Sequence, residues 1–398
     1  MKIARFLCAI LFASVVISGC GKKESVLGIK TIDVDFRNRS VDMPAGIPVM
    51  DIVGAHNIVV SDTFLLVLAE NPSGFLQVYS TNSLGYLGSF CLKGRARNEF
   101  HSASANTDQV IIRDNHVIPV IFDSYSDPGS VDYHSVLKTV DLTASLRKGS
   151  TVVLSSNECD MYTNNDILLL GDDFDTRFEY QMQYEDNEDT IFRHILYNNG
   201  RKKEISIFNR LMDTNTKKKY LPYFSNITKH PSRNLVVQLY ERLDYLIYMD
   251  FETDRFFAVH GKGTISFDDT FESQDPLHSF HFGDVASSSG YMMSLYRNGD
   301  YTLNTESSHL IMNGSVMAGT YEHLPEVLVF DWDGNYITGF RMKETIHAIE
   351  YDQIHGILYG LDRNDGIIYS YDLRKGDGSV REQRSAPKET LGLSKNRP

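Results

Sequence analysis

The chain has 398 residues, with 52 acidic and 39 basic side chains and a formal net charge of −13 at pH 7. Removing the predicted leader, which carries two of the basic residues, leaves 37 basic residues against 52 acidic ones. A protein this acidic disfavours nucleic acid as a partner. The basic runs 201–203 and 217–219 are separated by strand-like residues, so we interpret them as solvated loops.

The N-terminus predicts a secretory signal peptide over residues 1–19. Lys2 and Arg5 precede an apolar stretch that ends near Ile17. This stretch is shorter than the roughly 20 residues that a helix needs to cross a bilayer, so we expect it to be cleaved. The sequence from Ile17 to Cys20, Ile-Ser-Gly-Cys, resembles the bacterial lipobox, in which the cysteine becomes the acylated first residue.

We therefore expect an envelope protein that is lipid-anchored through Cys20, in the outer membrane. Residues 20–28 would form a polar tether between the lipid and the folded body. Lys22 and Lys23 precede the single Glu24, a pattern that leaves the periplasmic and the surface-facing sides both open.

Few cysteines remain after this processing. Cys8 leaves with the signal and Cys20 is lipidated, so only Cys91 and Cys159 are left in the folded body. This excludes a framework of several disulfides. One bridge between these two residues and two free thiols both remain open.

A strand–turn–strand unit recurs along the chain. The segment 326–340, EVLVFDWDGNYITGF, has an apolar strand, an Asp-Gly turn and a return strand, and 350–373 repeats the pattern. Four earlier copies lie at 75–90, 136–154, 194–208 and 245–259. A further apolar strand or pair precedes each copy. Units of four strands that recur about every 40–50 residues are typical of propeller blades, so we predict an all-β, six-bladed β-propeller over 29–375.

The two ends of the repeat array suggest how the ring closes. The last unit has three clear strands, whereas 29–36, IKTIDVDF, alternates apolar and polar residues and has no hairpin partner nearby. We predict that 29–36 joins the last blade as its outer strand. Residues 378–380 of the polar tail (376–398) are a rival for this position, and an open β-sandwich array is the alternative architecture.

The C-terminal units also carry a family resemblance. Residues 331–340 and 349–373 together resemble the TolB-like six-bladed β-propeller lipoproteins of Bacteroides-type bacteria. The resemblance implies the fold more than a function, because most of that family has no assigned activity. Residues 93–100, KGRARNEF, resemble a loop of the family but lack its Gly-Pro. TolB has an α/β domain ahead of its propeller, for which we find no room before residue 50, so TolB's partners are not transferred.

Four residues are weak candidates for ligand binding in loops. His278 and His281 are three apart in an acidic segment, 260–284, and could share a metal if the loop turned helically. Arg95 and Arg97 could hold an anion. For both pairs the preferred interpretation is a solvated, hydrogen-bonded loop, because loops of acidic proteins collect such residues.

Other segments hold weaker signals for chemistry. The acidic run 171–190 offers carboxylates for Ca²⁺ or for glycoside cleavage, with a mobile hairpin extension as the preferred interpretation. Residues 331–335 lack the later acidic ligands of a calcium loop and are interpreted as a turn. The sequence contains no phosphate-binding glycine loop, HExxH or GxSxG motif.

These patterns favour a non-catalytic propeller that binds a glycan, peptide or envelope protein through loops on one face. The alternative is a propeller hydrolase or lyase with Ca²⁺ in its channel, and no other cofactor is expected. The alternative needs polar side chains that converge on the axis from several inner strands. The candidates for that role are Asp114, Asp123, Gln238 and Glu350.

Overall fold

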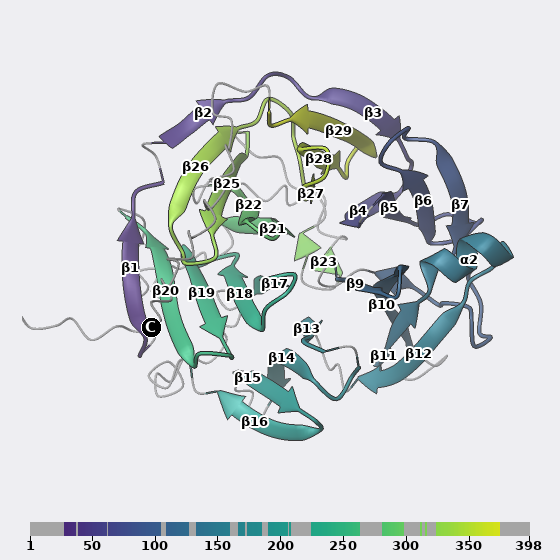
Figure 1. The fold of residues 1–398 in the computed structure, drawn as a ribbon, viewed down its shortest axis with the longest axis horizontal. Coiled ribbons are helices and arrows are strands. Elements are labelled where there is room, and N and C mark those ends of the chain that lie inside the picture. Colours follow the sequence, from purple (N-terminus) through teal and green to yellow (C-terminus); the bar gives the residue numbers. More distant parts are fainter. Residues whose placement is uncertain are drawn as a thin grey trace, which may run out of the picture.

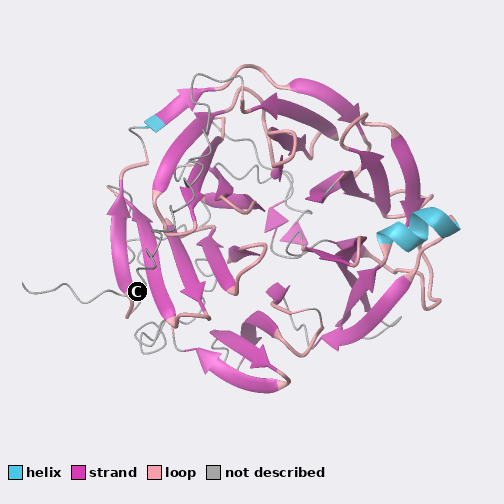
Figure 2. Ribbon diagram, viewed as in Figure 1, coloured by secondary structure: helices cyan, strands magenta, loops and turns pink. Residues whose placement is uncertain are grey.

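The computed structural model describes most of the chain between Gly28 and Arg374. It describes residues 28–36, 39–61, 63–104, 109–126, 133–159, 166–171, 173–184, 190–205, 207, 224–262, 281–297, 311–312, 315–316 and 324–374. The predicted leader, Cys20, nearly all of the tether and the C-terminal tail lie outside these residues. Six sheets are arranged in a ring about a central axis (Figure 1), and almost all regular structure is β-strand (Figure 2). The prediction of an all-β, six-bladed propeller is confirmed.

The first three blades follow one another along the chain, and the strands of each succeed one another outward from the axis (Figure 1). Blade 1 contains β4 (Ala55–Ser61), β5 (Phe64–Ala69), β6 (Leu76–Ser80) and β7 (Tyr86–Phe90). Blade 2 contains β8 (Ala103–Ser104), β9 (Val110–Arg113), β10 (His116–Ser126), β11 (Tyr133–Val140) and β12 (Val153–Cys159). Blade 3 contains β13 (Asp166–Leu169), β14 (Arg177–Tyr184), β15 (Thr190–Asn198) and β16 (Arg201–Ile205).

The last three blades follow the same pattern. Blade 4 contains β17 (Ser225–Lys229), β18 (Leu235–Tyr240), β19 (Tyr245–Asp250) and β20 (Arg255–Gly261). Blade 5 contains β21 (Phe282–Ser287), β22 (Tyr291–Tyr296), β25 (Glu326–Asp331) and β26 (Tyr336–Arg341). Between β22 and β25 lies the two-stranded sheet of β23 (Ile311–Met312) and β24 (Ser315–Val316). Blade 6 contains β27 (Ala348–Asp352), β28 (Ile357–Asp362) and β29 (Ile367–Asp372).

An N-terminal strand closes the ring, as predicted, but it is not the expected one. The fourth strand of blade 6 is β3 (Ile47–Asp51), which pairs antiparallel with β29. The predicted closing segment instead contains β1 (Lys30–Val34), which pairs in parallel with β20. Between them, β2 (Ser40–Asp42) pairs in parallel with β26. The N-terminal arm, residues 29–51, therefore runs along the outer edges of blades 4, 5 and 6 (Figure 1).

Chain continuity explains this arrangement. The strand β3 is followed almost directly by β4, and blade 1 neighbours blade 6, so a short connection suffices. The earlier segment is held elsewhere by its apolar residues: Ile32, Val34 and Phe36 pack against the core cluster between blades 4 and 5.

Apolar burial occurs between neighbouring blades. Six hydrophobic clusters each join residues of two adjacent blades, so every blade packs on both faces. Strand β18 is buried at all six of its positions, which explains why the second strands have continuous apolar sequences. A blade of this kind is stable only between neighbours.

Polar side chains also join neighbouring inner strands. The Gln109 amide donates to the Leu169 carbonyl (2.6 Å) and accepts from the Leu169 N–H (2.9 Å), which links blades 2 and 3. The Asn226 amide donates to the Gly283 carbonyl between blades 4 and 5 (3.0 Å). The Asp284 carboxylate accepts from the Ile349 N–H between blades 5 and 6 (2.7 Å). These bonds satisfy backbone groups that face the next blade.

The aspartates that close the third strands of blades 4 and 5 have a structural role in the turn that follows. Asp331 accepts hydrogen bonds from the N–H groups of Asp333 and Asn335, and Asp250 accepts from those of Glu252 and Thr253. This is the ordinary behaviour of aspartate at the start of a turn. The expected positive φ angles also occur, at 83° for Gly334 and 73° for both Gly200 and Gly366.

One predicted hairpin differs from its five counterparts. Within 136–154, β11 and β12 pair as expected, but a helix, α2 (Leu142–Lys148), connects them. Asp141 caps its N-terminus by accepting from the Ala144 N–H, and Gly149 ends it at φ 70°. A helix of seven residues is too short to show a sustained helical period in the sequence.

The two remaining cysteines are free thiols. Cys91 is buried and Cys159 is partly buried. They belong to different hydrophobic clusters, so no disulfide links blade 1 to blade 2 here. Burial raises the pKa of Cys91 well above its usual value and that of Cys159 to about 11, which keeps both thiols protonated.

Candidate functional site

The central channel has two different ends. At the short-turn end, first and second strands are joined by tight connections such as 230–234 and 353–356. At the opposite, long-loop end, second strands lead to third strands and each blade leads to the next. The connections 262–281 and 297–325 belong to this end, as do the short turns 241–244 and 363–366.

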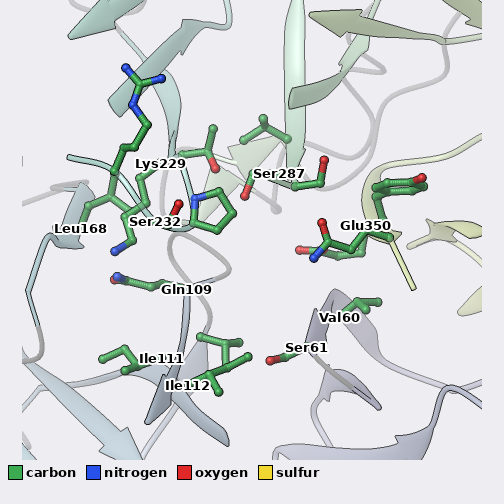
Figure 3. Close-up of a pocket in the computed structure, with 18 of the residues that line it drawn as sticks. Val60, Ser61, Gln109, Ile111, Ile112, Leu168, Lys229, Ser232, Ser287 and Glu350 are labelled. Atoms are coloured by element: carbon green, nitrogen blue, oxygen red, sulfur yellow. The ribbon is translucent and has the colours of Figure 1, made fainter. Parts of the chain in front are cut away.

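A cavity of about 510 Å³ lies at the short-turn end of the channel. All six blades contribute to its lining, which includes Ser61, Gln109, Leu168, Lys229, Ser287 and Glu350. Figure 3 shows these side chains around an open centre, with Glu350 on the side opposite Leu168 and Gln109. This volume lies within the range of ligand sites in proteins.

Several polar groups of this cavity are already engaged in the fold. The Asp352 carboxylate accepts from the N–H groups of Ile354 and His355 and lies 2.6 Å from Nδ1 of His355. Arg233 pairs with Asp250 at 2.9 Å. These contacts fix the short turns, so the walls of the cavity are held in place without a ligand.

The polar lining also includes Glu350, Lys229 and several hydroxyl groups. Glu350, on β27, is only 6% exposed, and Lys229, at the end of β17, is partly buried. The hydroxyls of Ser61, Thr228 and Ser287 add groups that can both donate and accept hydrogen bonds. Such a surface suits a ligand with several hydroxyl or amide groups.

Charged residues gather at the long-loop end. We call them the channel charge cluster: Glu241, Arg242, Asp244, His281, Asp284, Arg297, His347, Asp362 and Arg363. They come from blades 4, 5 and 6. Arg242, Asp244, His281 and Arg297 are each no more than 6% exposed. Charges buried this deeply are rarely found without partners or a function.

The carboxyl groups of the cluster have shifted pKa values. Burial raises the pKa of Glu241 to about 7, against the opposing charges of Arg242 and Arg363. Burial likewise raises the pKa of Asp284 to about 6, and Arg363 again opposes the shift. Both acids are therefore partly protonated near neutral pH.

The weak site candidates from the sequence do not come together. Arg95 and Arg97 are exposed in the connection that follows blade 1, where Gly94 N–H bonds to the Phe100 carbonyl. His281 begins blade 5 and is buried, with Nδ1 3.9 Å from Asp244 Oδ1. His278 lies outside the described residues, as does most of the acidic segment around it. The sequence therefore placed only His281 near the channel.

The four residues considered for a convergent catalytic site also separate. Asp123 accepts from Lys138 Nζ at 2.7 Å, and Gln238 lies 2.6 Å from His194, so both have structural partners. Asp114 occupies a turn at φ 50°. Glu350 alone lines the cavity.

The main members of the channel charge cluster missed from the sequence are Arg242 and Arg363. Each directly follows an acidic residue at the end of a second strand, in 241–244 (ERLD) and 362–365 (DRND). A short charged turn after a fully apolar strand is the signal that could have identified them. It is weak, because solvated turns have the same composition.

Among the residues that the structure describes, no group of three or more His, Cys, Asp or Glu side chains could hold a metal ion. Within the same part of the chain, no helix has the length and apolar character needed to cross a bilayer.

Comparisons with known proteins give only distant likenesses in structure. No family model matches the chain, and no curated protein matches it in sequence. A candidate exported protein from Bacteroides fragilis has 11% identity and a TM-score of 0.44, over 86% of this chain and 98% of that one. The Neurospora crassa Pan2 WD40 domain has 10% identity and a TM-score of 0.40, over 78% and 73%. The Myceliophthora thermophila Cps50 (Swd1) propeller domain has 9% identity and a TM-score of 0.40, over 82% and 99%. We base no functional argument on these.

Proposed function

We propose that this protein is an envelope-anchored, non-catalytic propeller that binds a glycan, or a peptide or protein segment of similar polarity, in the cavity at the short-turn end. The observation that carries the proposal is the lining of that cavity. Six blades supply hydroxyls, amides and charges of both signs around an open volume of about 510 Å³. Binding sites of this kind are concave and largely formed in advance.

The rigid turns favour recognition. Because the Asp352 and Asp250 carboxylates already bond to their own turns, the cavity walls lose little freedom when a ligand binds. Hydroxyl-rich ligands are favoured over apolar ones, since Ser61, Thr228 and Ser287 would be left without partners by an apolar surface.

The test is a glycan array followed by calorimetry, on protein without its leader and with the substitution C20S. We expect at least one glycan to bind. E350Q should weaken the affinity for that glycan about tenfold, because it removes one charged hydrogen bond. The matched control is E70Q, because Glu70 is exposed and distant from the cavity lining. If E350Q and E70Q bind the same glycan equally well, the cavity is not the site.

The lipid anchor is a separate part of the proposal, supported by the lipobox at Cys20 and by the resemblance to TolB-like lipoproteins. In cells, wild-type protein would incorporate labelled palmitate and partition into detergent, whereas C20S would not. Equal partitioning of the two would contradict the anchor.

Catalysis with a channel-bound Ca²⁺ is the second candidate, favoured by the buried carboxylate of Glu350 in an open cavity. It predicts that millimolar Ca²⁺ raises the thermal midpoint and EDTA lowers it. A ligand at 100 times its dissociation constant adds about 2.7 kcal/mol, which a melting curve detects.

A further inference from the structure

The Arg363 guanidinium lies close to the channel axis. It acts electrostatically on Glu241 of blade 4, Asp284 of blade 5, His347 of blade 6 and His56 of blade 1. Blade 5 separates blade 4 from blade 6, so a side chain from the blade 6 turn reaches all four groups only near the axis. Its backbone is fixed, since Arg363 N–H bonds to Nδ1 of His347 at 3.2 Å.

One N–H group of this guanidinium lacks the partner that such a position normally requires. Its Nε atom is buried and has no hydrogen-bond acceptor. No ion pair connects Arg363 to a carboxylate in the described part of the chain, although Glu241 and Asp284 lie within electrostatic range. An arginine donor left unsatisfied in this way costs about 1–3 kcal/mol or more.

Two further arginines add positive charge near the same groups. Arg242 and Arg297, from blades 4 and 5, are 2% and 6% exposed. Burial lowers the pKa of His347, and the charges of Arg297 and Arg363 lower it further. Burial likewise lowers the pKa of His281, and the charge of Arg242 lowers it further. The histidines of the cluster are therefore neutral near pH 7, while all three arginines keep their charge.

The nearby acids offset part of this charge. Asp362 lies 3.3 Å from His347, and Asp244 accepts from the Tyr296 hydroxyl at 3.1 Å; neither neutral partner removes the negative charge of its carboxylate. Burial raises the pKa of Glu241 to about 7 and that of Asp284 to about 6, so these two acids carry less negative charge near neutral pH than ordinary carboxyls do. An anion at Arg363 is therefore repelled less by them than by ordinary carboxylates.

We propose that Arg363, supported by Arg242 and Arg297, forms an anion-binding site at the long-loop end of the channel that takes a carboxylate or phosphate group. The planar guanidinium offers two parallel donors, the geometry that both oxyanions accept. Partly exposed Glu241, Asp284 and Arg363 line this end, so solvent reaches the site. The site is distinct from the short-turn cavity, whose lining does not include any of these three residues.

The test is calorimetric titration of the purified full-length protein with inorganic phosphate, D-galacturonate and, as the uncharged sugar, D-galactose. We expect at least one of the two anions to bind, with galactose at least tenfold weaker, and the preferred anion to distinguish a phosphate ligand from an acidic sugar. R363Q should weaken anion binding at least tenfold. R341Q is the matched control, because Arg341 pairs with Asp42 on the exposed outer edge of blade 5.

Each contrary result overturns the proposal. If neither anion binds more tightly than galactose, the protein has no anion site. If R363Q and R341Q bind the anion with equal affinity, Arg363 does not belong to the site. If R363Q does not fold, R363K decides, because lysine keeps the charge but loses the paired donors and should weaken binding at least threefold. The glycan test at the short-turn end uses other variants and other ligands, so either proposal can fail alone.

Discussion

Phe36 holds the N-terminal arm to the propeller, and its replacement by alanine should be strongly destabilising. Its ring is 5% exposed and lies edge-on to four aromatic rings, those of Phe282, Tyr296, Phe330 and Tyr336, at centroid distances of 5.5–6.3 Å. Its carbonyl accepts a hydrogen bond from the Tyr336 hydroxyl at 2.9 Å. The residue therefore joins the arm to the cluster between blades 4 and 5.

The magnitude follows from the loss of this ring. Truncating a buried phenylalanine to alanine costs about 3–5 kcal/mol, since burial is lost and a cavity remains. The four edge contacts place F36A toward the upper part of this range, because each aromatic pair adds about 0.5–1.5 kcal/mol beyond buried area. Unfolding also releases β1 and β2, which lie on either side of Phe36 in the chain.

Urea unfolding at 25 °C, followed by fluorescence, measures the change in free energy. The matched control is I47A, a large-to-small substitution in the same arm at a position that is 66% exposed; it should change stability by less than about 0.5 kcal/mol. A cost for F36A below about 1 kcal/mol, or equal to that of I47A, would refute the view that the arm is anchored through this ring.

Three further predictions concern the inner strands, the turns and the channel. Q109L removes both bonds to Leu169 and should cost about 1–3 kcal/mol for each buried backbone group left unsatisfied, measured by urea unfolding; full stability would show that water replaces the amide. G366A should cost at least about 1 kcal/mol, because φ is 73° and the new Cβ would lie 2.3 Å from the Ile52 carbonyl oxygen, whereas G290A, with open space around it, should be neutral. Glu241 binds its proton more tightly in the folded protein than in the unfolded chain. Its ionisation therefore does not change the free energy of unfolding below the unfolded pKa of about 4.5, and it lowers that free energy increasingly as the pH rises to about 7. E241Q should therefore gain about 1–3 kcal/mol over wild type between pH 5 and pH 8, and parallel stability profiles would contradict this.

The blades could be predicted from the sequence because their signals are local. An Asp-Gly or Asn-Gly turn between apolar runs specifies a hairpin within about 15 residues, as in 326–340, where Gly334 adopts the expected positive φ. The closing strand could not be assigned in the same way. Residues 29–36 and 47–51 are both short and strand-like, and only contacts with strands far along the chain distinguish them, since Lys30 pairs with Phe257 and Asp51 with Ile367.

Helix α2 was missed although its signals are present. Asp141 is a good N-cap, Arg147 and Lys148 occupy the last turn, and Gly149 supplies the left-handed end. The repeat pattern favoured a plain hairpin at this position, and seven residues are too few for a period to contradict it. The prediction from the repeat was correct for the pairing of β11 with β12 and wrong for the connection between them.

The sites lay beyond sequence reasoning for a different reason. The cavity takes two to six residues from each of six blades, and the role proposed for Arg363 depends on groups in three other blades. Propeller geometry brings the ends of the inner strands together at the axis. Which of their side chains already bond to other groups of the protein depends on individual hydrogen bonds. Gln109 and Asp352 line the cavity, yet both are engaged with backbone groups of the fold.

The two ends of the channel differ in how closely their polar groups are tied to the turns. At the short-turn end, carboxylates such as Asp250 and Asp352 bind the N–H groups of their own turns, so a change in turn length would break bonds that fix the cavity. At the long-loop end, the connections 262–281 and 297–325 are long, and loop length adds little free energy to closure. A partly buried charge such as Arg363 still requires a fixed position, and it has one in the tight turn 363–366, where Gly366 N–H bonds to the Asp362 carbonyl at 2.8 Å. Insertions can therefore alter what covers this end without moving the guanidinium, so we expect the anion site to survive shortening of 297–325.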